Sequence, residues 1–204
     1  MEVLSDWDRN TGVGSVGTSL AVFWGNQLLM EARDMDRPWD AYIFDLLAKE
    51  APDNMKITAF EKAVDRLVED FGTWNTPWGE INRFQRLSGD IDAGFDDSKP
   101  YIPVGLASGN WGALAAYGAR ATDDTKRLYG YRGNSFVAVV EFGEKVKAKT
   151  ILAGGQSSDP NSAHFFDQAQ RYADVNFKEV AYYREEVEKR GQVKYRPGKR
   201  EVGN

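Results

Sequence analysis

His164, the only histidine of the chain, lies in a stretch rich in polar side chains, GGQSSDPNSAHFFDQ at 154–168. Serine, histidine and aspartate so close together are the residue types of a hydrolytic triad. A triad depends on spatial geometry, however, and not on closeness in sequence. We therefore favour a structural interpretation, in which a sharp loop leads into a helix. Ser162 fits the N-cap of that helix, and Asp167 falls in its first turns, where a negative charge favours the helix dipole.

Glu141 is the second candidate for chemistry, because it lies near the end of a strand predicted for NSFVAVVEF at 134–142. β-branched and aromatic residues between turn formers are typical of a strand. Both of its alternating faces are mostly apolar, which predicts a central, buried strand. A carboxylate there costs several kcal/mol unless a donor satisfies it. Two interpretations stay open: Glu141 reaches solvent, or it is a functional carboxylate paired with a histidine or an arginine.

Two further patterns resemble binding motifs but lack the context that those motifs need. The glycines of GVGSVG at 12–17 have the spacing of a phosphate loop, yet no strand precedes them and the lysine is missing, so we interpret them as a flexible turn. Four aspartates in one loop suit calcium, but the EF-hand spacing is not met, which favours a solvated loop. These are Asp90, Asp92, Asp96 and Asp97. The sequence predicts no cofactor and no metal site.

Composition excludes several classes of function. The 204 residues suffice for one domain or a large piece of one, and 42% of them are hydrophobic. The 26 basic and 31 acidic residues are well mixed, so no basic stripe indicates a nucleic-acid partner. The absence of cysteine excludes disulfides, thiolate nucleophiles and cysteine zinc sites. No apolar run approaches the roughly 20 residues that span a bilayer, and the first residues, MEVLSDWDRNTG, do not form a signal peptide.

The elements that must position these residues begin with helices. Thr18 or Ser19 is the expected N-cap of the first. In the third, Thr58 and Glu61 match a capping box, and Gly72 lies where a C′ glycine ends a helix. Apolar residues at helical spacing predict these three helices at 17–33, 39–50 and 58–72.

Strands follow in the second half of the chain. The last two form a hairpin through Gly143 and Glu144, and a polar helical finish follows them. Strands are predicted at 112–119, 126–132, 134–142 and 145–153, and helices at 164–175 and 181–190. The order of elements predicts an α+β fold, with a helical segment over 1–88 and a β meander with closing helices over 89–204, as one structural unit. Such a sheet keeps exposed edges.

Five segments, in this order and spacing, together resemble one family. They are TPWGEINRFQRLSGD, YIPVGLASGNWGAL, YRGNSFVAVVEFGE, GGQSSDPNSAHFFDQ and YRPG. They are similar to the C-terminal part of penicillin acylase family proteins, which include acyl-homoserine-lactone, aculeacin-type and cephalosporin acylases. The resemblance covers nearly the whole chain, and the pattern GGQSxDPxSxHFxDQ is its most specific element.

The resemblance implies the C-terminal portion of an αββα sandwich of the N-terminal-nucleophile hydrolases. In that family a precursor cleaves itself, and the new N-terminal serine attacks an amide while backbone N–H and an asparagine stabilise the oxyanion. That serine lies several hundred residues upstream of the QSxDP element, and nothing around Gly14 and Ser15 matches the cleavage site. We therefore expect a fragment that is inactive alone, from a periplasmic or secreted acylase.

The resemblance also implies a role for Glu141. In cephalosporin- and aculeacin-type members a carboxylate from a late strand holds a histidine near the nucleophile, and Glu141 occupies the matching position. It would orient an imidazole that lies outside this chain, and His164 is not that residue. The implied partners are the remainder of the acylase precursor and a small acylated amide, with no nucleic acid and no membrane. The isolated fragment is expected to self-associate. A non-catalytic binding module and a separately encoded subunit on the same scaffold stay open as alternatives.

Overall fold

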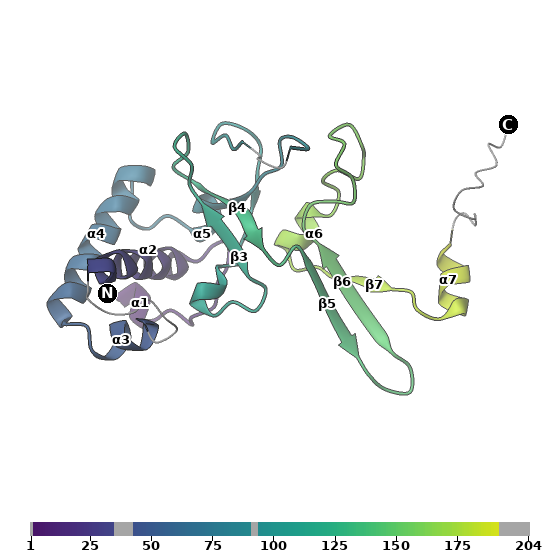
Figure 1. Ribbon diagram of the computed structural model, residues 1–204, viewed down its shortest axis with the longest axis horizontal. Helices are drawn as coiled ribbons and strands as arrows, with labels where there is room; N and C mark the ends of the chain where they lie inside the picture. The colour runs from purple at the N-terminus through teal and green to yellow at the C-terminus, as the bar shows by residue number, and fades with distance from the viewer. Residues whose placement is uncertain (1, 35–42, 91–93, 192–204) are drawn as a thin grey trace.

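The helical part and the strands lie one after the other along the molecule. The computed structural model describes residues 2–34, 43–90 and 94–191. Helices α1 to α4 form one end, a four-stranded sheet lies in the middle, and a three-stranded sheet followed by α7 forms the other end (Figure 1). This combination of helices with mainly antiparallel strands confirms the predicted α+β class.

The two long helices pack against each other and bound the first core. Helix α2 (Val16–Glu31) begins after Ser15, whose Oγ accepts a hydrogen bond from Thr18 N over 3.0 Å. The predicted N-caps Thr18 and Ser19 are therefore wrong, and both side chains are buried inside the helix. A serine one turn earlier satisfies the free N–H groups of the first turn.

Helix α4 (Asp53–Phe71) is longer than the sequence pattern predicts. It begins after Pro52, so Thr58 lies inside the helix and the predicted capping box is wrong. Proline suits a helix start because it has no N–H to leave unsatisfied. The end is confirmed: Gly72 has φ +81° and donates its N–H to Val68 O over 2.8 Å.

Three clusters of buried side chains hold the helical part and the sheets together. The first joins α2 and α4 to α5 (Trp78–Ile81), and the second lies under α3 (Ile43–Lys49) and the short η1 (Ala32–Asp34). Helix α1 (Glu2–Ser5) rests on α2. The third cluster joins both sheets, and it contains Val104, Tyr117, Ile151, Tyr172 and Ala173.

The first sheet has the order β2-β1-β4-β3. β1 runs parallel to β4, and the other pairs are antiparallel. The sequence predicts strands that overlap β3 and β4 but begin earlier, and it predicts no strand where β1 and β2 lie. Two or three residues are too few to show an alternating pattern. The strands are β1 (Asn82–Phe84), β2 (Ile102–Pro103), β3 (Tyr117–Arg120) and β4 (Leu128–Gly133), and the short η2 (Gly109–Trp111) precedes β3.

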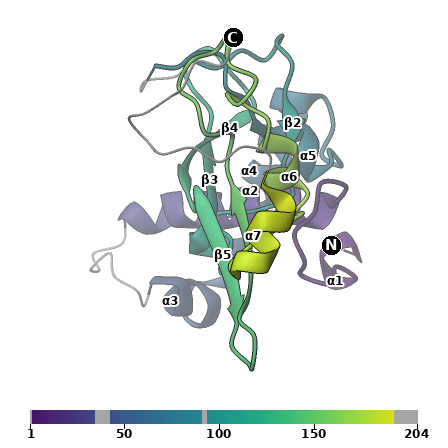
Figure 2. The same cartoon turned by 90° about the vertical axis from the view of Figure 1, so that its right-hand side faces the viewer.

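The second sheet has the order β5-β6-β7, and it contains the predicted hairpin. The hairpin consists of β5 (Phe136–Glu141) and β6 (Lys147–Leu152), with Glu141 opposite Lys147. Its tip projects beyond the rest of the molecule in both views (Figure 1, Figure 2). β7 (Lys178–Val180) pairs antiparallel with β6 on the side away from β5.

β5 is an edge strand and not the central, buried strand that its sequence predicts. Within the described residues only β6 pairs with it, and five of its six residues are exposed. An apolar pattern on both faces indicates that a strand is suited to burial, but burial also requires other elements that pack on the strand. Within the described residues, no element covers most of β5.

The C-terminal segment is less helical than predicted. Turns fill most of 164–168, and α6 (Ala169–Ala173) begins only after Gln168, so Ser162 is not its N-cap. Helix α7 (Arg184–Arg190) lies within the predicted 181–190. None of the helices in the described ranges has the length and apolar character needed to cross a membrane.

Candidate functional site

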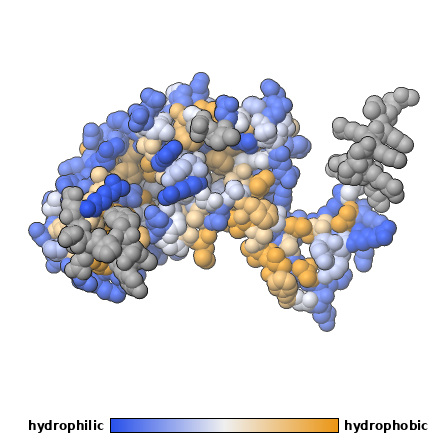
Figure 3. All heavy atoms as spheres, viewed as in Figure 1, coloured by the Kyte–Doolittle hydropathy of each residue, from blue (hydrophilic) through white to orange (hydrophobic). Residues whose placement is uncertain are grey.

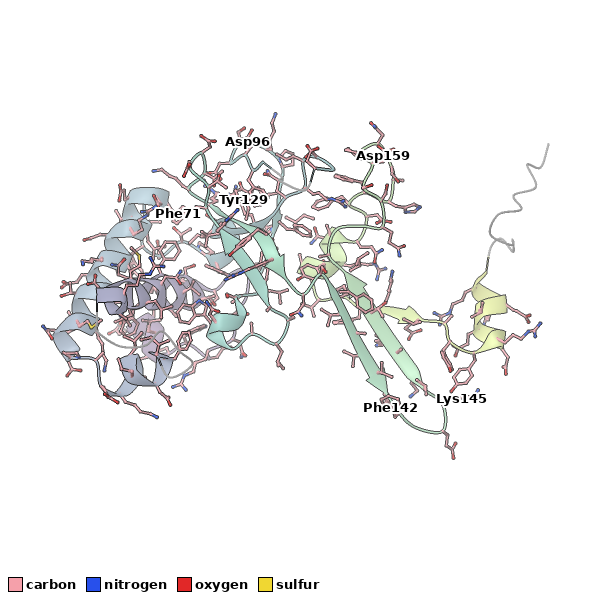
Figure 4. The ribbon with its side chains drawn as sticks, viewed as in Figure 1. Phe71, Asp96, Tyr129, Phe142, Lys145 and Asp159 are labelled. Atoms are coloured by element: carbon pink, nitrogen blue, oxygen red, sulfur yellow. The ribbon has the colours of Figure 1, made fainter. Side chains whose placement is uncertain are left out.

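Glu141 lies at the exposed end of β5. Its side chain is 71% exposed, and its Oε1 lies 3.7 Å from Lys147 Nζ on the opposite strand. The next residue, Phe142, is 84% exposed at the hairpin tip (Figure 4). In this chain Glu141 therefore reaches solvent, and within the described residues its ion-pair partner is a lysine and not a histidine or an arginine.

One face of the second sheet is apolar and uncovered. Side chains alternate along a strand, so Phe136, Ala138 and Val140 share a face opposite to that of Glu141. All three are exposed, Phe136 to 58%, and Val180 of β7 extends the same face. We call this surface the open sheet face, and apolar side chains gather there in Figure 3. A sheet face of this composition normally packs on a second layer.

The free edge of β5 offers unpaired backbone groups on the same residues. Ala153 N donates to Ser135 O over 2.8 Å, which fixes the phase of the β5–β6 ladder. In an antiparallel pair the backbone groups of successive residues point alternately to the partner and away. Phe136, Ala138 and Val140 therefore direct their N–H and C=O groups away from β6. An edge of this kind is a template for a further strand.

His164 forms a pair with Asp167 but not a triad. Its Nδ1 lies 2.9 Å from Asp167 Oδ2, and the imidazole side chain is 73% exposed. The Ser162 hydroxyl accepts from the backbone N–H of His164, and that of Ser157 accepts from Asp159 N. Within the described residues no serine hydroxyl makes a hydrogen bond with the imidazole, so the arrangement provides no activated nucleophile.

Backbone contacts hold the loop around His164 against the second sheet. Gly154 has φ +83°, and its O accepts from Gln168 N over 2.7 Å. A Cβ at Gly155 would lie 2.1 Å from His164 O, so only glycine fits this close approach. The Arg86 guanidinium stacks over the Phe165 ring at 3.9 Å. These contacts hold the loop, whose tip carries Asp159 in Figure 4, in a defined shape, which agrees with a structural role.

The glycine and aspartate patterns serve local structure. Ser15 of GVGSVG caps α2. Asp96 Oδ1 accepts from Ser98 N and Oγ, and the bond to the Ser98 side chain lowers the pKa of Asp96. Asp97 accepts from the Tyr129 hydroxyl at 2.8 Å. Asp92 lies outside the described residues. No cluster of three or more metal-ligating side chains occurs in the ranges that the structure describes.

One cavity of about 140 Å³ between the helices and the first sheet was not predicted from the sequence. Its polar lining comes from α2, β1, the segment around η2, and β4. These residues are spread from Asn26 to Arg132, so no short spacing pattern joins them. Three asparagines and two tryptophans are among the lining residues, but none of them forms a recognisable motif.

A comparison with known protein families places these segments in context. The family model described as Penicillin amidase matches residues 1–189. The match includes both candidate residues, Glu141 and His164, and all the helices and strands described above except the last residue of α7.

Proposed function

The chain belongs to the penicillin amidase family, and from that premise we propose that it is the C-terminal part of an acylase that hydrolyses a linear amide. The family is one of amide hydrolases, which supports the reaction class. In our proposal the nucleophile is an N-terminal serine in a part of the protein outside this chain. Its oxygen attacks the amide carbonyl, the amine departs with a proton, and water then releases the acid from the acyl-enzyme.

The open sheet face is the observation that carries the proposal of a larger protein. Apolar side chains and unpaired backbone groups coincide on Phe136, Ala138 and Val140, and both need a covering element. The opposite side of the same sheet is covered only near Ile151, which is buried in the cluster with Tyr172 and Ala173 of α6. An apolar sheet face that no element covers supports a missing layer, which the remainder of an acylase would supply.

Glu141 has a proposed part in this assembly. A partly buried carboxylate beside an imidazole fixes the orientation of the ring and favours its charged form. Lys147 is the group that now neutralises the Glu141 carboxylate, at 3.7 Å and in solvent. Exposed pairs of this kind contribute little, about 0–1 kcal/mol, so a histidine from another part of the acylase, on the Glu141 side of the sheet, can replace the lysine at low cost.

The location and the partners follow from the same proposal. The whole acylase would be periplasmic or secreted, its substrate a small acylated amide, and the partner of this chain the rest of the precursor. The isolated chain would associate with itself through the open sheet face.

The test compares the chain alone with the complete acylase. Both are incubated with phenylacetyl, glutaryl and long-chain acyl amides, and release of amine is followed. We expect turnover only from the complete protein. Turnover by the purified chain that disappears on substitution of one of its own residues would contradict the proposal. A complete protein that binds these amides without cleaving them would favour the non-catalytic module instead.

A further inference from the structure

A second cavity, with an apolar lining, lies between α2, α3 and η2. Its volume is about 280 Å³. An engineered apolar cavity of about 150 Å³ stays dry and binds benzene, so the cavity beside α3 has room for a molecule of two fused rings. Its walls are formed by Trp24, Leu28 and Leu29 of α2, by Phe44 and Leu47 of α3, and by Trp111 of η2.

Contacts with neighbouring residues hold the three aromatic side chains of this cavity in place. An added Cβ at Gly25 would lie 2.5 Å from Trp111 Cη2, so the indole occupies space that a side chain on α2 would otherwise fill. The Phe44 ring meets the Trp111 ring edge to face, with 5.8 Å between their centres. The Trp24 ring packs in the same way on Phe60 at 5.5 Å. An aromatic molecule in the cavity can make further edge-to-face or offset contacts with these rings, which a saturated molecule cannot.

The Trp24 indole N–H and the Lys56 ammonium, both at the cavity, already have partners. Trp24 Nε1 donates to Lys56 O over 2.9 Å. Lys56 Nζ donates to Ala48 O over 3.1 Å and lies 3.9 Å from Asp53 Oδ1. Among the described lining residues Lys56 is the only charged one. A charged ligand would therefore lose hydration without gaining a free counter-charge, so the cavity favours an uncharged molecule.

We propose that this cavity binds an uncharged aromatic molecule of two fused rings. Its wall residues can be reached from solvent, because Phe44 is 40% exposed and Trp24, Leu28 and Trp111 are half-buried. A bound ring system would remove apolar surface of the walls and of the ligand from water, which drives the binding. The inference does not depend on the proposed amide hydrolysis, since it uses only residues of this chain.

The ligand class is tested with three soluble probes. Indole, indole-3-acetate and n-octanol are titrated into the isotope-labelled chain, and the tryptophan side-chain signals are followed by NMR. Indole-3-acetate adds a charge to the same rings, and n-octanol is uncharged but has no ring. We expect indole to shift the Trp24 and Trp111 signals and not that of Trp7, which does not line the cavity. It should bind on the order of 10-fold more tightly than indole-3-acetate and several-fold more tightly than n-octanol. Equal affinities for indole and either other probe would overturn the assigned class.

The position of the site is tested with a matched pair of variants. Phe44→Leu removes one aromatic wall but keeps the side chain apolar, and it should weaken indole binding several-fold. Phe142→Leu is the control: it makes the same substitution at the hairpin tip, where Phe142 is 84% exposed and does not line the cavity, so indole binding should not change. Both side chains are exposed, and an unaltered NMR spectrum of each free variant verifies the fold. No saturable response to indole, or equal weakening in both variants, would refute the site.

Discussion

Tyr129 donates its hydroxyl to Asp97 Oδ1 over 2.8 Å, and this bond ties the aspartate-rich loop to β4. The other carboxylate oxygen of Asp97 accepts from Lys126 N over 3.0 Å. The Asp97 side chain therefore attaches the loop to the start of β4, and the Phe95 ring stacks on Tyr129 at 4.9 Å.

Asp97→Ala should lower the free energy of unfolding by about 1–3 kcal/mol, because it leaves the hydroxyl of the buried Tyr129 without its hydrogen-bond acceptor. Denaturant unfolding measures the change. Asp124→Ala is the control, since Asp124 is exposed in a turn and should differ from the parent by less than about 0.5 kcal/mol. Equal stabilities of the two variants would show that the Asp97 contacts contribute nothing.

Alkaline pH should destabilise the protein through its buried tyrosines. Burial raises the pKa of Tyr117, whose hydroxyl donates to Arg83 O over 2.7 Å, and burial also raises that of Tyr172. A raised pKa means that the folded state keeps the proton more firmly than the unfolded state. The contribution to stability is therefore complete below the unfolded pKa of about 10 and is lost as the pH rises above it.

The measurement for this pH effect is unfolding at several pH values from 7 to 11. Tyr117→Phe should be about 1 kcal/mol less stable at neutral pH, because it lacks the bond to Arg83, yet its stability should fall less steeply above pH 10. Tyr182→Phe, at an exposed ring, should follow the parent protein. A parallel curve for Tyr117→Phe would contradict the assignment.

Glu141→Gln should reduce kcat of the complete acylase on the order of 10-fold or more, with a smaller effect on KM. The charge that stabilises an imidazolium matters most as the transition state forms, and general acid–base groups contribute about 10²–10⁴-fold. Steady-state kinetics give the answer. Glu144→Gln, in the hairpin turn, should leave both constants unchanged. Unaltered kcat in Glu141→Gln would remove the residue from the catalytic machinery.

In the isolated chain the same Glu141→Gln variant should melt within about 4 °C of the parent protein, because an exposed pair with Lys147 contributes about 0–1 kcal/mol. Differential scanning calorimetry measures this. A clear fall in melting temperature would show that Glu141 has a structural function in this chain.

The isolated chain should associate in a concentration-dependent manner through the open sheet face. Val140→Lys places a charge on that face and should weaken association, whereas Leu114→Lys changes a fully exposed residue elsewhere and should not. Analytical ultracentrifugation distinguishes the species. A strictly monomeric parent protein at high concentration would count against this surface.

The sequence could predict the elements whose pattern is long and locally complete. The β5–β6 hairpin and the end of α4 at Gly72 are such cases, because alternation, turn residues and a C′ glycine all act over a few neighbours. β1 and β2 could not be predicted, because they are strands only through their pairing with segments that are distant in the chain. The exposure of Glu141 could not be predicted for a related reason. Burial of a strand depends on the elements that pack against it, and an apolar pattern does not show whether those elements are present. The burial of Asn82 could not be predicted either, because its amide donates to two backbone carbonyls more than twenty residues away.

The parallel pairing of Asn82 with Leu128 sets an order of events for folding. The hairpin joins segments that are close in the chain, so it closes a short loop, and the contacts of α2 with α4 lie wholly within the N-terminal part of the chain. The first sheet instead requires a long loop to close before β1 gains its central neighbour, and such non-local pairing is slow. During synthesis the helical half can therefore collapse early, while the Asn82 segment waits for β4 to leave the ribosome.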